Sequence, residues 1–210
     1  MGFQKIAPCV VINLMACFKD FLKAGVLVGM MASTIASSTA QASDLSNKLQ
    51  SSEYILLMRH TRAPGNGAPA NYTLDDCKTQ RNLSDEGRKQ AVTVGNWLKK
   101  QGVQTADVQS SAWCRCKDTA ELLNLGPVTV EPALASFFDD MAQAKPQNQK
   151  LERFIASRIN TKGKQALILV THHVNIYEFM GENIASGDMV LAKVNSNGKM
   201  TSYKLIPRPN

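Results

Sequence analysis

The sequence predicts an α/β fold: a three-layer sandwich with a mainly parallel central sheet and a C-terminal antiparallel hairpin at one edge. Three observations lead to this prediction. Strand-length apolar runs alternate with helix-length segments, the two strongest runs, residues 53–58 and 166–170, are apolar almost throughout, and two short runs flank Asn197-Gly198. Continuous apolar strands are typical of parallel sheets covered on both faces, and Asn-Gly is a turn signal of hairpins.

The first 42 residues have the layout of a secretory signal. Three lysines precede an apolar stretch at 24–35, and Ala40-Gln41-Ala42 matches an A-x-A cleavage site. A membrane anchor is the alternative, but this apolar core of 12 residues is shorter than the ~20 that a membrane span needs. We therefore predict that residues 1–42 are a signal peptide, with Met15 as an alternative start, and that residues 43–210 form a single domain.

Charge limits the classes of partner. Cleavage before Ser43 removes three lysines and one aspartate, which lowers the formal net charge from +7 to +5. A moderately basic exported protein suits an anionic substrate or an anionic envelope surface. No run of Lys and Arg and no interleaved aromatic platform favours nucleic acid. We expect a periplasmic or secreted protein that does not bind nucleic acid and is not stably inserted in a membrane after signal cleavage.

The first elements follow from local patterns. Residues 43–52 are polar and predict a loose leader into the strand at 53–58. Residues 61–81 are rich in Pro, Gly, Asn and Asp, which predicts a long loop of the kind that often carries function. A helix is expected over 84–100, because a serine cap and two acids open it and a glycine follows its end.

The rest of the chain is expected to continue the alternation. Its strands are predicted at 107–110, 129–131 and 166–170, its helices at 113–123, 150–160 and 175–181, and its hairpin strands at 189–194 and 200–206. Residues 134–146 show no clear period and are expected to be irregular. Folds of this class bind ligands at the carboxyl ends of their parallel strands.

All three histidines follow the strongest strands. His60 ends the first run, and His172 and His173 end the second, so central parallel strands would bring them to one rim. Three arginines are expected at the same rim: Arg59, Arg62 and Arg115. Guanidinium groups bind phosphate oxygens bidentately, and a neutral imidazole can attack phosphorus. The pattern therefore predicts a site for phosphate chemistry.

Other interpretations of these residues are weaker. His60 without the arginines would be read as a satisfied core histidine, and Arg59 and Arg62 could be loop surface charges. A metal site built from the three histidines is the main rival. Cationic arginines beside the histidines argue against it, and H-x-H and H-E-x-x-H spacings are missing from the sequence. No metal is predicted.

Four segments resemble one protein family. Leu57-Met58-Arg59-His60 is similar to the Arg-His-Gly motif of the histidine phosphatase superfamily, which has the phosphoglycerate-mutase-like fold. Residues 82–91 resemble its L-(S/T)-x-x-G-x-x-Q-A helix start, and residues 110–120 its S-S-x-x-x-R-x-x-x-T-A segment. Leu169-Val170-Thr171-His172 resembles the strand that carries its second histidine. Four motifs in the right order make a specific match.

The resemblance implies roles for these residues. His60 would be the nucleophile that forms a phosphohistidine, and the phosphoryl group would be held by Arg59, Arg115 and His172. The implied further phosphate-binding residues are Arg62, Asn66 and His173. No metal or organic cofactor would be required.

The sequence departs from the family pattern in three places. Thr61 stands where the first motif has glycine, and His173 stands where a glycine usually follows the second histidine. The glutamate that many members carry is absent near residues 134–136. Asp139 or Asp140 would then be the general acid, with Asp75, Asp76 and His173 as further alternatives.

Three cysteines remain after signal cleavage. Cys77 lies in the long loop, and Cys114 and Cys116 flank Arg115. An oxidising compartment favours a disulfide from Cys77 to either Cys114 or Cys116, which would pin the loop over the pocket. Three reduced thiols are the alternative.

Together these features predict an exported phosphomonoesterase that hydrolyses a phosphorylated small molecule or an envelope sugar through a phosphohistidine. Loop segments around 76–82 and 171–176 resemble the branch that contains lipopolysaccharide core heptose phosphatases, which implies a lipopolysaccharide-type substrate. A mutase would use the same pocket but is not expected in an exported protein. The alternative from another class is a binding module of the same fold that holds a phosphorylated ligand with weak or no catalysis.

Overall fold

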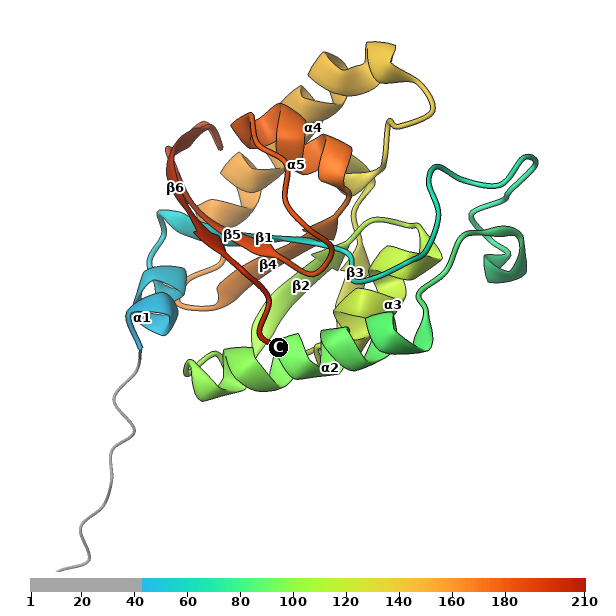
Figure 1. Ribbon diagram of the computed structural model, residues 1–210. Helices are drawn as coiled ribbons and strands as arrows, with labels where there is room; N and C mark the ends of the chain where they lie inside the picture. The colour runs from blue at the N-terminus through green and yellow to red at the C-terminus, as the bar shows by residue number, and fades with distance from the viewer. Residues whose placement is uncertain (1–42) are drawn as a thin grey trace, which may run out of the picture. The chain divides into compact units, whose positions relative to one another are not determined.

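A six-stranded sheet forms the centre of the computed structural model, which describes residues 43–210 (Figure 1). The strand order is β3-β2-β4-β1-β5-β6. The strands are β1 (Tyr54–Arg59), β2 (Ala106–Ser110), β3 (Val128–Val130), β4 (Ala166–Thr171), β5 (Met189–Val194) and β6 (Met200–Ile206). Strands β3, β2, β4 and β1 are parallel, whereas β5 pairs antiparallel with β1 and β6 antiparallel with β5. The predicted parallel sheet with an antiparallel hairpin at its edge is confirmed.

Helices cover both faces of the sheet (Figure 1). The helices are α1 (Asp44–Gln50), α2 (Asp85–Lys100), α3 (Cys114–Leu122), α4 (Ala144–Ile159) and α5 (His173–Met180), with 3-10 turns η1 (Cys77–Thr79), η2 (Pro132–Leu134) and η3 (Met141–Gln143). The first three helices pack on one face and α4 and α5 on the other, which gives the predicted three layers. None of the helices within residues 43–210 is both long and apolar enough to cross a membrane.

Strand β1 shows why the sheet must be covered twice. Leu56 and Met58 belong to the core beneath α1, α2 and α3, while Ile55 and Leu57 belong to the core beneath α4 and α5. All four side chains are fully buried. Alternate residues of a strand point to opposite faces, so an apolar run of this kind needs a helical layer on each side.

Two predictions about local structure are wrong. Residues 43–52 are not a loose leader, because the Ser43 side chain accepts a hydrogen bond from Ser46 N and caps α1, which buries Leu45 and Leu49 against the core. Tertiary packing stabilises a helix that is too short to form alone. Helix α4 also begins at Ala144, inside the segment expected to be irregular; its proline lies in the first turn, where a helix tolerates one.

The predicted signal peptide, residues 1–42, lies outside the described residues. At the carboxyl ends of β1, β2 and β4 the chain leaves the sheet, and the long loop that leads to α2 extends beyond this edge (Figure 1). Helix α1 lies toward the other end of the sheet (Figure 1). The carboxyl edge therefore carries the predicted site residues.

Candidate active site

The two predicted catalytic histidines meet because their strands are neighbours. Strands β1 and β4 run parallel with Arg59 opposite Thr171, so the residues that follow them emerge together. The ring centroids of His60 and His172 lie 5.6 Å apart, and each residue is only 2% exposed. Ser111 joins them from the end of β2, the other neighbour of β4.

His60 is held as a neutral imidazole with one free nitrogen. Its Nδ1 lies 2.8 Å from the carbonyl oxygen of Thr61. A carbonyl oxygen can only accept, so Nδ1 carries the proton and Nε2 keeps its lone pair. Burial lowers the pKa of His60 to about 3, and the charges of Arg115 and Arg59 act in the same direction. The ring is thus a nucleophile that stays unprotonated over a wide pH range.

His172 is fixed in the opposite tautomer. Its Nδ1 lies 3.1 Å from Nη2 of Arg115, which can only donate, and its Nε2 lies 2.8 Å from Oγ of Ser111. Nδ1 must therefore accept, and Nε2–H donates to the serine hydroxyl. Burial, reinforced by the charge of Arg115, holds the pKa of His172 well below its ordinary value.

The arginines carry donors that the protein itself does not use. Arg59 donates from Nη1 to the carbonyl oxygen of Ile184 at 2.7 Å, but its buried Nε has no hydrogen-bond partner among residues 43–210. Within the same residues, Nε and Nη1 of Arg115 are also buried and unpaired. Burial lowers the pKa of both guanidinium groups. Unpaired buried donors are costly, and a phosphoryl group would supply the missing acceptors.

Comparison with known proteins agrees with this geometry. The family model described as histidine phosphatase superfamily (branch 1) matches residues 55–153. Residues 55–153 of this chain belong to the histidine phosphatase superfamily. The predicted family is confirmed, and with it the class of phosphatases, that is, phosphoric monoester hydrolases. No match was found among curated proteins.

Several solved structures share the fold at low sequence identity. The protein histidine phosphatase SixA complexed with tungstate has 18% identity and a TM-score of 0.53, over 73% of this chain and 94% of that chain. A mycobacterial glucosyl-3-phosphoglycerate phosphatase in complex with VO3 has 16% identity and a TM-score of 0.52, over 74% and 98%. Mycobacterial hydrolase 1 has 16% identity and a TM-score of 0.53, over 74% and 98%.

The helix-start motif at residues 82–91 positions the chain that follows His60. The carbonyl oxygen of Arg62 accepts a hydrogen bond from Ser84 N, and its amide donates to Oε1 of Gln90 at 3.1 Å. A Cβ atom added to Gly87 would lie 2.1 Å from the same carbonyl oxygen. The glycine and glutamine of the helix-start motif therefore let α2 dock directly on the backbone beside the nucleophile.

Thr61, where the superfamily motif has glycine, fits without strain. Residues with positive φ in the described chain do not include Thr61, so this position does not need a glycine. Its fully buried Oγ1 lies 3.1 Å from Oγ1 of Thr119, which itself donates to the carbonyl oxygen of Arg115. Because the hydroxyl proton of Thr119 is already donated to Arg115, the hydroxyl of Thr61 is the donor in this pair. The hydroxyl pair connects the nucleophile's strand to the helix that carries Arg115.

Arg81 belongs to the site but was not predicted from the sequence. It is half-buried, its Nε donates to the carbonyl oxygen of Gly67 at 2.9 Å, and its Nη1 donates to that of Ala63. Its charge contributes to the lowered pKa values of both His60 and His172. The one signal available was its place directly before the helix-start motif.

The structure places Arg62 differently from the prediction. Its exposed side chain pairs with Glu86 at 3.2 Å, and its charge is not among those that lower the pKa of His60. The docking of its backbone on α2 turns the side chain toward that helix. Asn66 is exposed on the long loop. His173 is half-buried next to the site, and burial together with the charges of Arg59 and the other site arginines lowers its pKa.

A disulfide joins Cys77 to Cys114, with Cα atoms 5.7 Å apart. This selects one of the two predicted pairings. Gln80 strengthens the same junction, because its Oε1 accepts from Cys114 N at 3.0 Å. The long loop is thus attached to the start of α3. Cys116 is free and buried, its Sγ lies 3.5 Å from Nε2 of His172, and burial raises the pKa of its thiol to about 12.

The candidate acids differ in their surroundings. Asp140 uses Oδ1 to accept from Ala142 N at 3.2 Å, as the cap of η3. Asp139 is exposed, and its charge acts on two groups of the site: it opposes the burial that lowers the pKa of Arg115, and it adds to the burial that raises the pKa of Tyr72. Of the two predicted acids, Asp139 is therefore the one that faces the site. No three or more His, Cys, Asp and Glu side chains within residues 43–210 are grouped to hold a metal ion.

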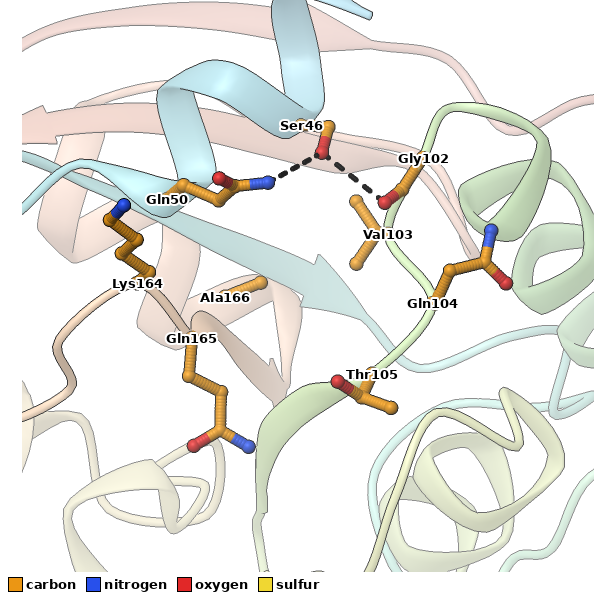
Figure 2. Close-up of a pocket in the computed structure, with 9 residues that line it drawn as sticks. All are labelled: Ser46, Gln50, Gly102, Val103, Gln104, Thr105, Lys164, Gln165 and Ala166. Carbon is orange, nitrogen blue, oxygen red and sulfur yellow. Dashed lines mark hydrogen bonds between the residues drawn. The ribbon is translucent and has the colours of Figure 1, made fainter. Parts of the chain in front are cut away.

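A cleft lies at the other end of the sheet, where β2 and β4 begin (Figure 2). It encloses about 460 Å³. Its lining is Ser46, Gln50, Gly102, Val103, Gln104, Thr105, Lys164, Gln165 and Ala166. Ser46 donates to the carbonyl oxygen of Gly102 and accepts from Gln50, as Figure 2 shows. The cleft holds none of the predicted site residues.

Proposed function

We propose that this protein is an exported phosphomonoesterase that hydrolyses a phosphorylated small molecule through a phosphohistidine on His60. One observation carries the proposal: Nδ1 of His60 is committed to the Thr61 carbonyl, so Nε2 is a free nucleophile beside the unpaired donors of Arg59 and Arg115. Two similar structures hold tungstate and VO3, which supports an oxyanion as the ligand of this fold.

The proposed reaction has two steps. Nε2 of His60 attacks phosphorus, the P–N bond forms as the P–O ester bond breaks, and the leaving oxygen takes a proton from the carboxylic acid of Asp139. Water then attacks the phosphohistidine, Asp139 takes the water's proton, and phosphate leaves as the P–N bond breaks. Arg59 and Arg115 stabilise the charge on the transferring phosphoryl oxygens in both steps.

His60→Asn tests the nucleophile. Removing it should lower kcat/KM for an aryl phosphate by about 10⁴-fold or more, because the covalent route is lost. Circular dichroism and the unfolding midpoint check that the variant is folded. Wild-type protein quenched during turnover of a ³²P-labelled substrate should carry acid-labile label on His60. A binding module would instead show saturable binding without label, and an active His60→Asn variant would rule out the mechanism.

Asp139→Asn tests the general acid, with Asp140→Asn as the matched control. The loss of kcat/KM should grow with the basicity of the leaving group: about threefold for p-nitrophenyl phosphate and about 10²-fold for an alkyl phosphate. Asp140→Asn should change neither rate by more than about twofold, since its carboxylate caps η3. Equal losses for both substrates in Asp139→Asn would contradict the role.

Export and the envelope substrate are parts of the same proposal. The signal-like layout of residues 1–42 and the Cys77–Cys114 disulfide support an oxidising compartment. The loop resemblance to lipopolysaccharide core heptose phosphatases supports a phosphorylated envelope sugar. Mass spectrometry of the periplasmic fraction should find one domain starting at Ser43. A full-length chain confined to the cytoplasm would exclude export.

A further inference from the structure

A second, smaller cleft adjoins the candidate active site. It encloses about 200 Å³ between the first turns of α5 and the segment that leads to α4. The residues that matter here are Phe137, Met141, His173, Tyr177, Glu178 and Asn183. None of these residues has a part in the proposed reaction.

His173 connects the cleft to the phosphoryl pocket. It follows His172 directly, and its ring lies 5.7 Å from that of Phe138. The charges of Arg59, Arg81 and Arg115 all contribute to its lowered pKa, after burial. The same imidazole therefore lines the cleft on one side and lies in the field of the phosphate-binding arginines on the other.

Two lining residues of the cleft lie one helical turn apart. His173 and Tyr177 are four residues apart on α5, so they lie on one face of the helix and about 6 Å apart along its axis. A group that leaves from phosphorus at the His173 end would thus reach Tyr177 with a single six-membered ring.

The lining of the cleft combines apolar and polar side chains. Tyr177 and Met141 are exposed by 49% and 59%, unusually open for large apolar side chains, and Phe137 is buried. Glu178 supplies a carboxylate acceptor, and Asn183 supplies both a donor and an acceptor. Such a surface suits a ring with an apolar face and hydroxyl groups on its edge.

We propose that this cleft binds the leaving group of the substrate and that this group is a hydroxylated ring. The apolar face of the ring packs on Tyr177 and Met141, and a hydroxyl donates to Glu178. The inference rests on the proposed function, because it names the substrate class of the same site. A sugar phosphate and a nucleoside monophosphate both offer such a ring, and the probes below distinguish them.

Equilibrium binding tests the cleft separately from catalysis. Glucose 6-phosphate, adenosine 5′-monophosphate and inorganic phosphate are titrated into His60→Asn, which cannot turn over, with and without Tyr177→Ala. At least one ring phosphate should bind more tightly than inorganic phosphate, and Tyr177→Ala should weaken that binding about tenfold. The Kd of inorganic phosphate should differ by less than about twofold between His60→Asn with and without Tyr177→Ala. If only one of the two ring phosphates binds more tightly than inorganic phosphate, that ligand shows whether the ring is a sugar or a nucleoside.

Two further variants complete the test. Glu178→Gln should weaken the preferred ring phosphate about three- to tenfold. Val92→Ala shortens an apolar side chain on α2, outside the cleft, whose exposure is similar to that of Tyr177. This control variant should leave the Kd of all three ligands unchanged. Ring phosphates that bind no better than inorganic phosphate, or a Tyr177→Ala variant that weakens all three ligands equally, would overturn the proposal. Failure of the proposed function would appear instead as absence of hydrolysis by the wild type.

Discussion

The two ends of the parallel sheet differ in how their polar groups are satisfied. At the amino end, in the cleft of about 460 Å³, Ser46 and Gln50 bond to each other, and Gln104 donates to the carbonyl oxygen of Lys99 at 2.8 Å. At the carboxyl end, buried nitrogens of Arg59 and Arg115 have no partner within residues 43–210. Arg158 Nε, whose guanidinium pairs with Asp107 near the start of β2, is also buried and unpaired. The carboxyl end differs because several such donors lie beside two buried histidines, and this grouping, rather than the size of a hollow, indicates where a ligand completes the structure.

Among the variants that test this difference between the two ends of the sheet, Arg115→Met is expected to have the largest effect. Losing two unpaired donors and the partner of His172 should lower kcat/KM for an aryl phosphate by about 10³-fold or more. The free energy of unfolding in urea should stay equal or rise, because an uncompensated buried charge is removed. A variant that keeps its activity, or that loses stability as strongly as activity, would show that Arg115 is structural.

Removing the Cys77–Cys114 disulfide is expected to have the next largest effect. The bridge spans 37 residues of sequence separation, and its loss in Cys77→Ser/Cys114→Ser should lower the free energy of unfolding by about 2–4 kcal/mol. Dithiothreitol should lower the stability of the wild type by the same amount and leave the double variant unchanged. A wild type that is equally stable with and without the reductant would contradict a stabilising bridge.

Arg81→Gln and Arg62→Gln form a matched pair at the carboxyl end. Arg81 acts on both histidines, whereas Arg62 pairs with Glu86 at the surface. We expect Arg81→Gln to lower kcat/KM about 10- to 100-fold and Arg62→Gln to change it by less than about threefold. The reverse order would mean that Arg62 leaves its ion pair to bind substrate, as the sequence alone suggested.

Lys164→Ala probes the amino end and should have the smallest effect. Lys164 is the one charged residue that lines the larger cleft. Because this end of the sheet lies away from the histidines, kcat/KM should stay within about twofold and the unfolding midpoint nearly constant. A tenfold loss of activity in this variant would break the distinction between the two ends.

The parts of the site that follow strands could be predicted from the sequence. An apolar run fixes a buried strand, parallel neighbours bring their carboxyl ends together, and His60 and His172 therefore meet. The family motif at residues 110–120, which follows the end of β2, predicted Arg115 at the same edge of the sheet. Asp139 remained one of several acids, because the loop that carries it has no periodic pattern to orient its residues.

Residues whose position depends on distant contacts could not be predicted. Arg81 reaches the site only because its loop folds back and is fastened to Cys114 by the disulfide and by Gln80. Arg62 faces away because α2 docks on its backbone. Helix α1 exists because a tertiary core covers two leucines in an otherwise polar segment. Apart from the disulfide, for which the sequence left two pairings open, local sequence does not indicate these contacts.

The two cysteines of α3 make correct oxidation a condition for an intact site. Cys114 is bridged to the long loop, while Cys116 lies against His172 two residues later. A non-native bridge from Cys77 to Cys116 would have to turn the helix start and carry Arg115 away from the histidines. The thiol of Cys116 is buried once the fold is complete, so the folded protein is protected from exchange. The pairing of Cys77 with Cys114, and not with Cys116, is thus the one that is compatible with Arg115 beside the histidines.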